Sequence, residues 1–582
     1  MFSAGTLEYI LTLGITISFA GFIIFAIRAR KDISQAMRGA GVGRMQMLAA
    51  LAVVIVFAAM VLSIVKPTQQ LFFDDILYQG GALSMMHSGQ AWQCNFGSPT
   101  QCFTGLIFHE PVGTAFNVAI AFAVGGVYQY SAYGIFFLLT ALSVLLVFAI
   151  TVLMLRKFIY GIYAELLFAL SPALMVWAFP TTSDLTMLAY SLIAVFSIMV
   201  FIQRKNINTF GMVLFSISLA AYMKVDAAIY LVLIPLIFLI LDDKSVLKSM
   251  HSNIKRVRRN LLNTKVLLLL LFFVIAISGE LTYAALEYRT GGYGYKGTFI
   301  QNTCNPSSSI SYVNVTHKID LQNFGANTCA NIAFWFDAFQ GGITYYHIMQ
   351  PIFFTFLGVI GVIVMLPYRR RDALALLIWF FAFFVLYTSF YAGSVTYGVD
   401  WRFVLSMIAQ VSILGGFGAG AIILAAKRFA GQRGYIAAVL AVSLLIAYSF
   451  YSMVPDLGVN PSSIGQAQQA RFYQNFVYAN ANAIPRSCLV FSFDPELFNL
   501  NGLSSIQFGN ITSAYTQSGL VSYHKDYPCL VVDYGYWCHT ARFGGLCNTV
   551  KGTFNLSAIA VTVDNFSGTA DTFGLYRVNG LR

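Results

Sequence analysis

Long apolar runs, each close to the length of a membrane-spanning helix, recur along most of the chain. A helix needs about 20 residues to cross about 30 Å of hydrocarbon. Such runs occupy residues 6–27, 47–65, 133–155, 159–178, 184–203, 266–286, 346–367, 373–392, 403–425 and 434–453. A longer apolar block, 208–241, has Lys224 and Asp226 at its middle, which indicates two short crossings around a polar turn. The pattern predicts a polytopic α-helical membrane protein with about twelve crossings.

One further apolar segment, residues 111–128, departs from this pattern. It reads "PVGTAFNVAIAFAVGGVY", begins at a proline and ends at two glycines, and is short for a crossing. We expect a re-entrant or interfacial helix at the external face. The first apolar run, in contrast, is expected to stay in the membrane rather than act as a cleaved signal peptide, because no basic region precedes it and "RARK" follows it directly.

The pattern changes after residue 453. The stretch "VPDLGVNPSS" breaks apolar periodicity and reads as a linker. Beyond it we expect a helix over 464–483 and strands at "CLVFSF", "CLVVDYGYW", "SAIAVTV" and "GLYRV". The predicted organisation is a transmembrane domain over 1–454, with external loops 66–132 and 288–345, and a small extracytoplasmic α/β domain over 455–582.

Composition and charge agree with a membrane protein and set its orientation. Hydrophobic residues make up 58% of the 582 residues, with a mean hydropathy of +0.71, which excludes a soluble multidomain protein. Lysine and arginine gather in alternate loops, which are the cytoplasmic ones by the positive-inside rule. None occurs from 67 to 155. This segment and both termini are therefore predicted to lie outside, in a plasma membrane, and the net charge of +12 is a topology signal rather than a sign of nucleic-acid binding.

The cysteines and glycosylation triplets test this orientation. Disulfides persist in oxidising external compartments, and all eight cysteines fall in predicted external segments. We expect pairing within each loop, Cys94 with Cys102 and Cys304 with Cys329. The tail allows three pairings among its four cysteines, which are Cys488, Cys529, Cys538 and Cys547. Candidate glycosylation sites at Asn-X-Ser/Thr triplets are Asn314, Asn510, Asn555 and Asn565.

Two adjacent aspartates stand in the first external loop, in "FDDILYQGGALSMMHSG". Asp74 and Asp75 repel each other and resist desolvation beside a bilayer, so a structural reason for the pair is hard to find. The residues after them are apolar enough to lie along the interface as a helix. A carboxylate held there can act as a general base for an incoming hydroxyl. The alternative is a solvated loop turn.

Other polar residues near the external face are few. His109 and Glu110 precede Pro111 and could ligate a metal or hydrogen-bond a sugar, or cap an interfacial helix. Asp184 begins the fifth crossing, where a plain N-cap is the alternative. Lys224 and Asp226 share a turn, where an ion pair with no further role is the alternative. Further candidates for the substrate or a metal are Tyr78 and Asp226.

A late stretch, "YTSFYAGSVTYGVDWRF", places an arginine outside although arginines otherwise gather inside. The guanidinium of Arg402 is a permanently charged fork that suits a phosphate, so we assign it to the phosphate of a lipid-linked donor. Tyr391 and Asp400 stand beside it as further donor-site candidates.

In their order, these motifs resemble those of the GT-C glycosyltransferase superfamily, most closely the branch of protein O-mannosyltransferases and lipid A aminoarabinose transferases. The resemblance spans about residues 60–425 and rests on "FDDILYQGG", "HEPVG", "LFALSPALMVWAFPTTSDL", "AAYMKVDAA" and "DWRF". It departs from the family at the missing second proline after Pro111 and at an extra N-terminal crossing.

The resemblance implies an inverting hexosyl- or pentosyltransferase. The sugar would move from a polyprenyl-phosphate donor to an external hydroxyl or amide of a protein, lipid or glycan. By the same resemblance Asp74 is the catalytic base and Asp75 its neighbour, Asp184 and Lys224 line the sugar-phosphate cavity, and Arg402 steadies the phosphate. A divalent metal (Mg²⁺, Mn²⁺ or Zn²⁺) is left open as a cofactor.

Two other functions remain as alternatives. The segment "VVDYGYW" at 531–537 resembles the "WWDYG" signature of oligosaccharyltransferases, which would make the acceptor an asparagine. Both leading tryptophans are valines here, and the segment reads as a strand between Cys529 and Cys538, so a chance match is favoured. A transporter or channel would place ionisable groups near the midplane and often shows two related halves, and the sequence shows neither.

Overall fold

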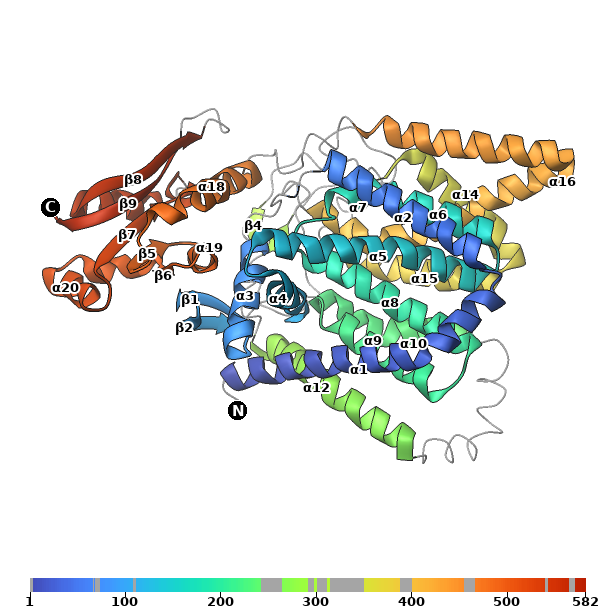
Figure 1. Ribbon diagram of the computed structural model, residues 1–582, viewed down its shortest axis with the longest axis horizontal. Helices are drawn as coiled ribbons and strands as arrows, with labels where there is room; N and C mark the ends of the chain where they lie inside the picture. The colour runs from blue at the N-terminus through green and yellow to red at the C-terminus, as the bar shows by residue number, and fades with distance from the viewer. Residues whose placement is uncertain are drawn as a thin grey trace.

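The computed structural model describes residues 4–65, 67, 74–107, 111–241, 264–290, 298–300, 311–313, 350–387, 400–454, 466–539, 543–564 and 571–582. A helical bundle occupies one end of the long axis and an α/β domain the other (Figure 1). The long and medium helices of the bundle are α1 (Ala4–Gly39), α2 (Arg44–Ile64), α5 (Gln129–Leu155), α6 (Phe158–Ala169), α8 (Ser183–Gln203), α9 (Ile207–Ala221), α10 (Tyr230–Leu241), α12 (Thr264–Thr290), α14 (Ile352–Tyr368), α15 (Arg370–Val385) and α16 (Leu405–Tyr451).

These helices coincide with the apolar runs of the sequence, apart from α1, which continues to Gly39 beyond its run, and two further differences. The run 159–178 is divided into α6 and the short α7 (Pro172–Val176), because a proline starts a helix well but does not continue one. The last two runs form a single element, α16, with a kink where Gly431 has a φ of 62°. Five of the described helices are long and apolar enough to cross a membrane. The chain therefore has the predicted helical membrane architecture, while the count of about twelve crossings stays a prediction.

Two shorter helices stand at the end of the bundle nearest the α/β domain. They are α3 (Asp74–Ser88) and α4 (Gly113–Gly125), at the positions where the sequence predicts interfacial or re-entrant helices. The N–H of Gly113 donates to the carbonyl of Tyr222, and a Cβ on Gly113 would lie 2.4 Å from that oxygen. A larger residue would collide with this carbonyl, so the glycine allows α4 to begin in direct contact with the turn that follows α9.

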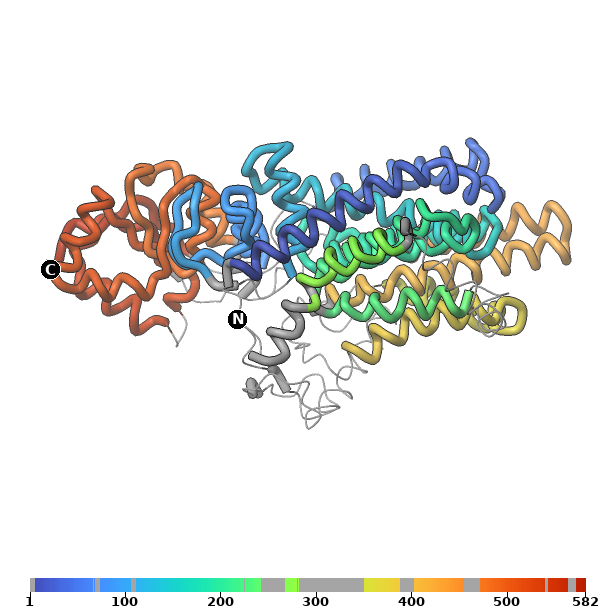
Figure 2. Tube along the Cα trace, turned by 90° about the horizontal axis from the view of Figure 1, so that it is seen from below, coloured from blue at the N-terminus to red at the C-terminus, as the bar shows by residue number. Residues whose placement is uncertain are grey.

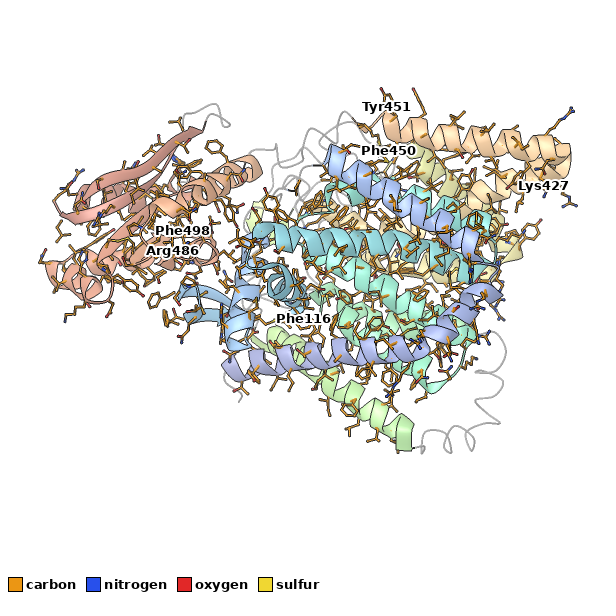
Figure 3. The ribbon with its side chains drawn as sticks, in the orientation of Figure 1. Phe116, Lys427, Phe450, Tyr451, Arg486 and Phe498 are labelled. Carbon is orange, nitrogen blue, oxygen red and sulfur yellow. A yellow bond between two sulfur atoms is a disulfide. The ribbon has the colours of Figure 1, made fainter. Side chains whose placement is uncertain are left out.

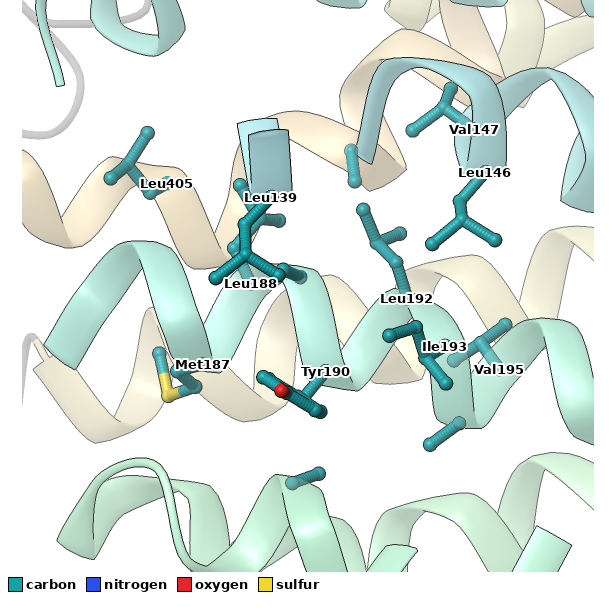
Figure 4. Close-up of a cluster of buried hydrophobic side chains, with 14 of the residues drawn as sticks. Leu139, Leu146, Val147, Met187, Leu188, Tyr190, Leu192, Ile193, Val195 and Leu405 are labelled. Carbon is teal, nitrogen blue, oxygen red and sulfur yellow. The ribbon is translucent and has the colours of Figure 1, made fainter. Parts of the chain in front are cut away.

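The bundle core is packed closely around α8. Figure 4 shows Met187, Leu188, Leu192, Ile193 and Val195 of α8 beside side chains of α5 and Leu405 of α16. Small residues let further helices approach: a Cβ on Gly361 of α14 would lie 2.0 Å from the carbonyl oxygen of Leu414 in α16. Close backbone approach at glycines is typical of helix packing in membranes. As a result α16, whose N-terminal end leads to the site, is held firmly against α14.

The α/β domain is built on a seven-stranded sheet with the order β2-β1-β6-β5-β7-β9-β8. Its strands are β1 (Trp92–Ser98), β2 (Gln101–Ile107), β5 (Cys488–Ser492), β6 (Ser504–Gln507), β7 (Cys529–Tyr534), β8 (Phe554–Asp564) and β9 (Asp571–Leu581). β5 pairs in parallel with β6 and β7, and the other pairs are antiparallel. The helices of the domain are α18 (Gln466–Asn480), α19 (Pro495–Leu500), α20 (Gln517–Asp526) and α21 (Gly544–Thr553).

The sheet is not formed by the tail alone, which differs from the division at residue 455 expected from sequence. The hairpin β1–β2 belongs to the first loop, between α2 and α5, which the sequence predicts to be external, and its strand β1 pairs with β6 of the tail. Figure 2 shows this blue hairpin beside the orange and red tail. The helix and four strands expected in the tail coincide with α18, β5, β7, β8 and β9, whereas the short β6 has no clear sequence pattern. The first loop thus ties the membrane domain to the tail.

Lys427, near the kink of α16, and the α/β domain lie at opposite ends of the molecule. Figure 3 labels Lys427 at one end, and Arg486 and Phe498 in the α/β domain at the other. This arrangement agrees with a cytoplasmic basic loop and an external tail, which remain a prediction because no membrane is part of the structure.

Candidate functional site

A continuous chain of ion pairs joins four segments that are far apart in sequence. Nη1 of Arg402 lies 3.0 Å from Oδ2 of Asp74, and Nε of Arg402 lies 3.2 Å from Oδ2 of Asp184. Nζ of Lys224 lies 2.8 Å from Oδ1 of Asp184 and 3.0 Å from Oδ2 of Asp226. Three carboxylates and two cations therefore share one cluster. We call Asp74, Asp184, Lys224, Asp226 and Arg402 the ionic cluster.

Each member of the ionic cluster stands at the end of a helix. Asp74 is the first residue of α3, and Asp184 is in the first turn of α8 behind the N-cap Thr182. Lys224 precedes the 3-10 turn η1 (Val225–Ile229), which separates α9 from α10. Arg402 lies in a second 3-10 turn, η4 (Asp400–Val404), immediately before α16. Because each of these side chains stands at the end of a helix, the packing of the helices brings the cluster together.

Burial varies across the ionic cluster. The side chain of Asp184 is 1% exposed and that of Lys224 is 5% exposed, whereas Arg402 is 13% and Asp74 24% exposed. Buried ions are tolerated only when they are paired and hydrogen-bonded. Asp184 meets this demand with Lys224, Arg402 and the hydroxyl of Thr182, 3.0 Å away. Asp184 and Lys224, at the buried end of the cluster, are therefore held in place by ion pairs and a hydrogen bond. Asp74 is the carboxylate of the cluster that is most exposed to solvent.

Aromatic rings complete the inner wall. Nζ of Lys224 lies 4.3 Å from the centre of the Phe403 ring and 5.7 Å from that of Tyr387. The two rings stack at 5.1 Å. A cation over an aromatic face is attracted by the ring quadrupole. Phe403 was missed as a site residue by sequence reasoning, although its position next to Arg402 was a usable signal.

Asp75 has surroundings unlike those of Asp74. Its carboxylate is fully buried and accepts hydrogen bonds from both the N–H and the hydroxyl of Thr181. That hydroxyl also lies 3.1 Å from the Asp75 carbonyl. Asp75 thus fastens α3 to the turn that begins α8, and the adjacent aspartates divide their contacts between Thr181 and Arg402.

Several predicted site residues fall outside the ionic cluster or outside the described residues. Tyr78 is buried on α3 next to Leu77. Only the backbone of Asp400 is described, two residues before Arg402. Outside the described residues lie Tyr391, His109, Glu110, Cys304, Cys329, Asn314 and Asn565. Among the residues that are described, no three His, Cys, Asp or Glu side chains are grouped to hold a metal ion, so the metal stays a prediction that rests on His109 and Glu110.

Three disulfides and two of the predicted glycosylation triplets lie within the described residues. Disulfides join Cys94 to Cys102, Cys488 to Cys529 and Cys538 to Cys547. The asparagines of two glycosylation triplets, Asn510 and Asn555, are exposed.

The oligosaccharyltransferase-like segment 531–537 belongs to the domain core. Strand β7, which carries its first part, is buried throughout. Asp533 accepts hydrogen bonds from the hydroxyls of Tyr473 and Ser492, and burial raises the pKa of Asp533 to about 8. The Tyr534 hydroxyl donates to the carbonyl of Cys547. These contacts give the segment a structural role.

The chain is similar to a known protein family over part of its length and to known structures over most of its length. The family of dolichyl-phosphate-mannose-protein mannosyltransferases matches residues 109–279. ArnT from Cupriavidus metallidurans bound to undecaprenyl phosphate is 14% identical, with 92% of this chain and 98% of that chain covered and a TM-score of 0.50. The apo state of the same protein is 14% identical, with 91% of this chain and 98% of that chain covered and a TM-score of 0.52. The archaeal oligosaccharyltransferase AglB from Archaeoglobus fulgidus is 11% identical, with 90% of this chain and 74% of that chain covered and a TM-score of 0.44. No curated protein sequence matches the chain.

Residues 109–279 are similar to the protein mannosyltransferase family, and the chain as a whole shares the fold of ArnT. Asp184 and Lys224 lie inside the matched segment, whereas Asp74 and Arg402 reach the ionic cluster from outside it.

Proposed function

We propose that the protein transfers a sugar from a polyprenyl-phosphate-linked donor to an acceptor at the external membrane surface, with inversion at the anomeric carbon. The observation that carries the proposal is the ionic cluster, because it brings a partly exposed carboxylate within 3.0 Å of a guanidinium at the end of a membrane bundle. Undecaprenyl phosphate, bound by the ArnT relative, has the chemistry expected of the lipid product.

The cations of the ionic cluster would receive the phosphate. A guanidinium presents several N–H donors in a planar fork that matches phosphate oxygens, and an ammonium adds a point charge. Arg402 and Lys224 are both held by Asp184, so they keep a fixed separation without a substrate. Preorganised positive groups stabilise negative charge as it develops on a leaving group.

Asp74 would act as the general base. The acceptor oxygen attacks the anomeric carbon, its proton passes to Asp74, and the bond from the anomeric carbon to the phosphate oxygen breaks with its electron pair left on the phosphate. Before the donor binds, Asp74 is paired with Arg402. A phosphate competes for the same guanidinium, and its binding would release the Asp74 carboxylate to the acceptor. The proposal therefore includes an order of binding, donor before acceptor.

The decisive variant is Asp74→Asn, which keeps the size of the side chain and removes the base. In proteoliposomes supplied with a polyprenyl-phosphate sugar, we expect transfer to fall by about 10²–10⁴-fold, the usual contribution of general base catalysis. Asp526→Asn, at an exposed position of α20, is the matched control and should transfer at the wild-type rate. Full transfer by Asp74→Asn would disprove the assignment of the base.

The acceptor is proposed only as a protein, lipid or glycan hydroxyl or amide. Asn-linked transfer of an oligosaccharide is a weaker alternative, because Asp533 of the "VVDYGYW" segment is fully buried by core contacts. Mass spectrometry of glycopeptides from a deletion strain would separate the two. Ion or solute flux through purified liposomes without sugar transfer would instead favour a transporter.

A further inference from the structure

Helix α3 belongs to two hydrophobic cores at once. Ile76, two residues after Asp74, is 2% exposed and packs in the core of the α/β domain with residues such as Val477 and Leu497. Ala82 and Met85 of the same helix pack in the core of the membrane bundle. Since a folded helix moves as a rigid element, a shift of the α/β domain would be carried to the first residues of α3.

A close contact between α3 and the tail is made by Glu496 of α19. A Cβ on Gly80 would lie 2.5 Å from Cγ and 2.7 Å from Cβ of Glu496, so the glutamate side chain lies directly on the helix backbone at that point. Gly80 is six residues from Asp74, about 9 Å along a helix with a rise of 1.5 Å per residue. The contact is thus close enough to set the placement of the Asp74 end.

Glu496 is buried in this interface. Its side chain is 3% exposed and, among the described residues, its Oε1 has no hydrogen-bond partner. It borders a small cavity whose other walls include Ser84, His87 and Asn499. An ionised carboxylate in such a place is costly, whereas a neutral carboxylic acid is tolerated. Accordingly, burial raises the pKa of Glu496 to about 8; the charge of Asp494 raises it further, while hydrogen bonds from the backbone of Glu496 and of Cys94 lower it.

We propose that Glu496 is a positioning residue: by packing its side chain on Gly80 it seats the α/β domain on α3 and so keeps Asp74 in place beside Arg402. The catalytic consequence rests on the proposed function, whereas the contact itself does not. The tail then acts on catalysis through α3, without a residue of its own in the ionic cluster.

A steric test inserts one methyl group into the contact. Gly80→Ala should push α19 away from α3, lower kcat by about ten- to hundredfold, and leave KM for the lipid donor within about twofold of wild type, because Arg402 and Lys224 are held by other helices. Amide hydrogen exchange of residues 75–88 should become faster. Gly552→Ala, in the same α/β domain with nothing within 4 Å of the added Cβ, is the matched control. Equal kcat and exchange in the two variants would overturn the proposal.

A second test changes the charge and preserves the shape. The pKa of Glu496 is raised from an ordinary 4.5 to about 8, so the seated state binds the proton more tightly than a separated one. Seating is therefore strongest below about pH 4.5 and weakens as the pH rises through about 8. Glu496→Gln cannot ionise. We expect the wild type to lose kcat and to gain exchange in α3 between pH 7 and 9, and Glu496→Gln to lose much less.

Other groups could titrate near this contact, and the comparison of variants at the same pH separates them. Asp494 on the preceding turn and His87 on α3 face the same region, while Cys94 of β1 is in a disulfide and Gln101 of β2 does not titrate. Identical pH profiles for wild type and Glu496→Gln would refute the role of Glu496. If the wild type transfers no sugar, the proposed function fails, and the exchange measurements still decide whether Glu496 seats the domain.

Discussion

Replacement of Arg402 by lysine tests the central geometry of the ionic cluster. The arginine uses two different nitrogens, Nη1 for Asp74 at 3.0 Å and Nε for Asp184 at 3.2 Å. A lysine keeps the positive charge but offers a single nitrogen, which cannot occupy both the Nη1 position beside Asp74 and the Nε position beside Asp184. The variant thus removes one charge-assisted interaction without removing the charge.

The magnitude follows from that count. A hydrogen bond to a charged group contributes about 1.5–3 kcal/mol, and each 1.36 kcal/mol is a factor of ten in rate. The kcat/KM for the lipid-linked donor should therefore fall roughly 10- to 150-fold in Arg402→Lys. The assay is initial-rate transfer in proteoliposomes over a range of donor concentrations, with thermal unfolding measured in parallel to verify the fold.

A matched control is available at the other end of the bundle. Arg369, between α14 and α15, also uses several nitrogens: Nη1 lies 2.8 Å from the carbonyl of Leu155, Nη2 lies 3.2 Å from that of Met154, and Nε lies 2.8 Å from Oδ2 of Asp372. Arg369→Lys should lower stability but leave kcat/KM unchanged. The reasoning is refuted if Arg402→Lys keeps kcat/KM within about twofold of wild type, or if Arg369→Lys loses as much.

Two further predictions concern stability. A Cβ on Gly418 of α16 would lie 2.2 Å from the carbonyl oxygen of Leu357 in α14, so Gly418→Ala should destabilise the bundle by about 1–3 kcal/mol. The control is Gly134→Ala, which should not shift the unfolding temperature because nothing lies within 4 Å of the added Cβ. Equal shifts of the unfolding temperature in the two variants would contradict the packing argument. In the α/β domain the pKa of Asp533 is raised from 3.8 to about 8 by burial, so its contribution to stability is complete below about pH 3.8 and is lost as the pH rises through about 8. Thermal unfolding of the full chain between pH 5 and 9 should then show a weaker pH dependence in Asp533→Asn than in the wild type, and an unchanged slope would show that Asp533 is not the group responsible.

The elements of the membrane part could be predicted from hydrophobic pattern because each helix must satisfy its own backbone hydrogen bonds and present apolar side chains to lipid or to other helices. That requirement is local, and α2, α5 and α8 begin and end within a few residues of their apolar runs. Charged residues are so rare in such a chain that Asp184 and Lys224 stood out as candidates without any knowledge of their neighbours.

The partners of those residues could not be predicted in the same way. Arg402 and Asp74 are 328 positions apart, and nothing in either local sequence specifies the other. Asp74 and Asp75 look alike in sequence, yet one pairs with Arg402 and the other is buried against Thr181, because successive residues of a helix point in directions about 100° apart.

The sequence by itself determined the membrane class, the approximate helices and the small set of polar residues from which the candidate site is built, since burial of apolar surface and backbone hydrogen bonding act over short stretches of chain. Only the tertiary structure decided that four helix ends meet in one ionic cluster, that the hairpin β1–β2 extends the sheet of the tail, and that Glu496 rests on Gly80. These are long-range contacts, and their energies depend on the packing of elements that no single stretch of sequence encodes.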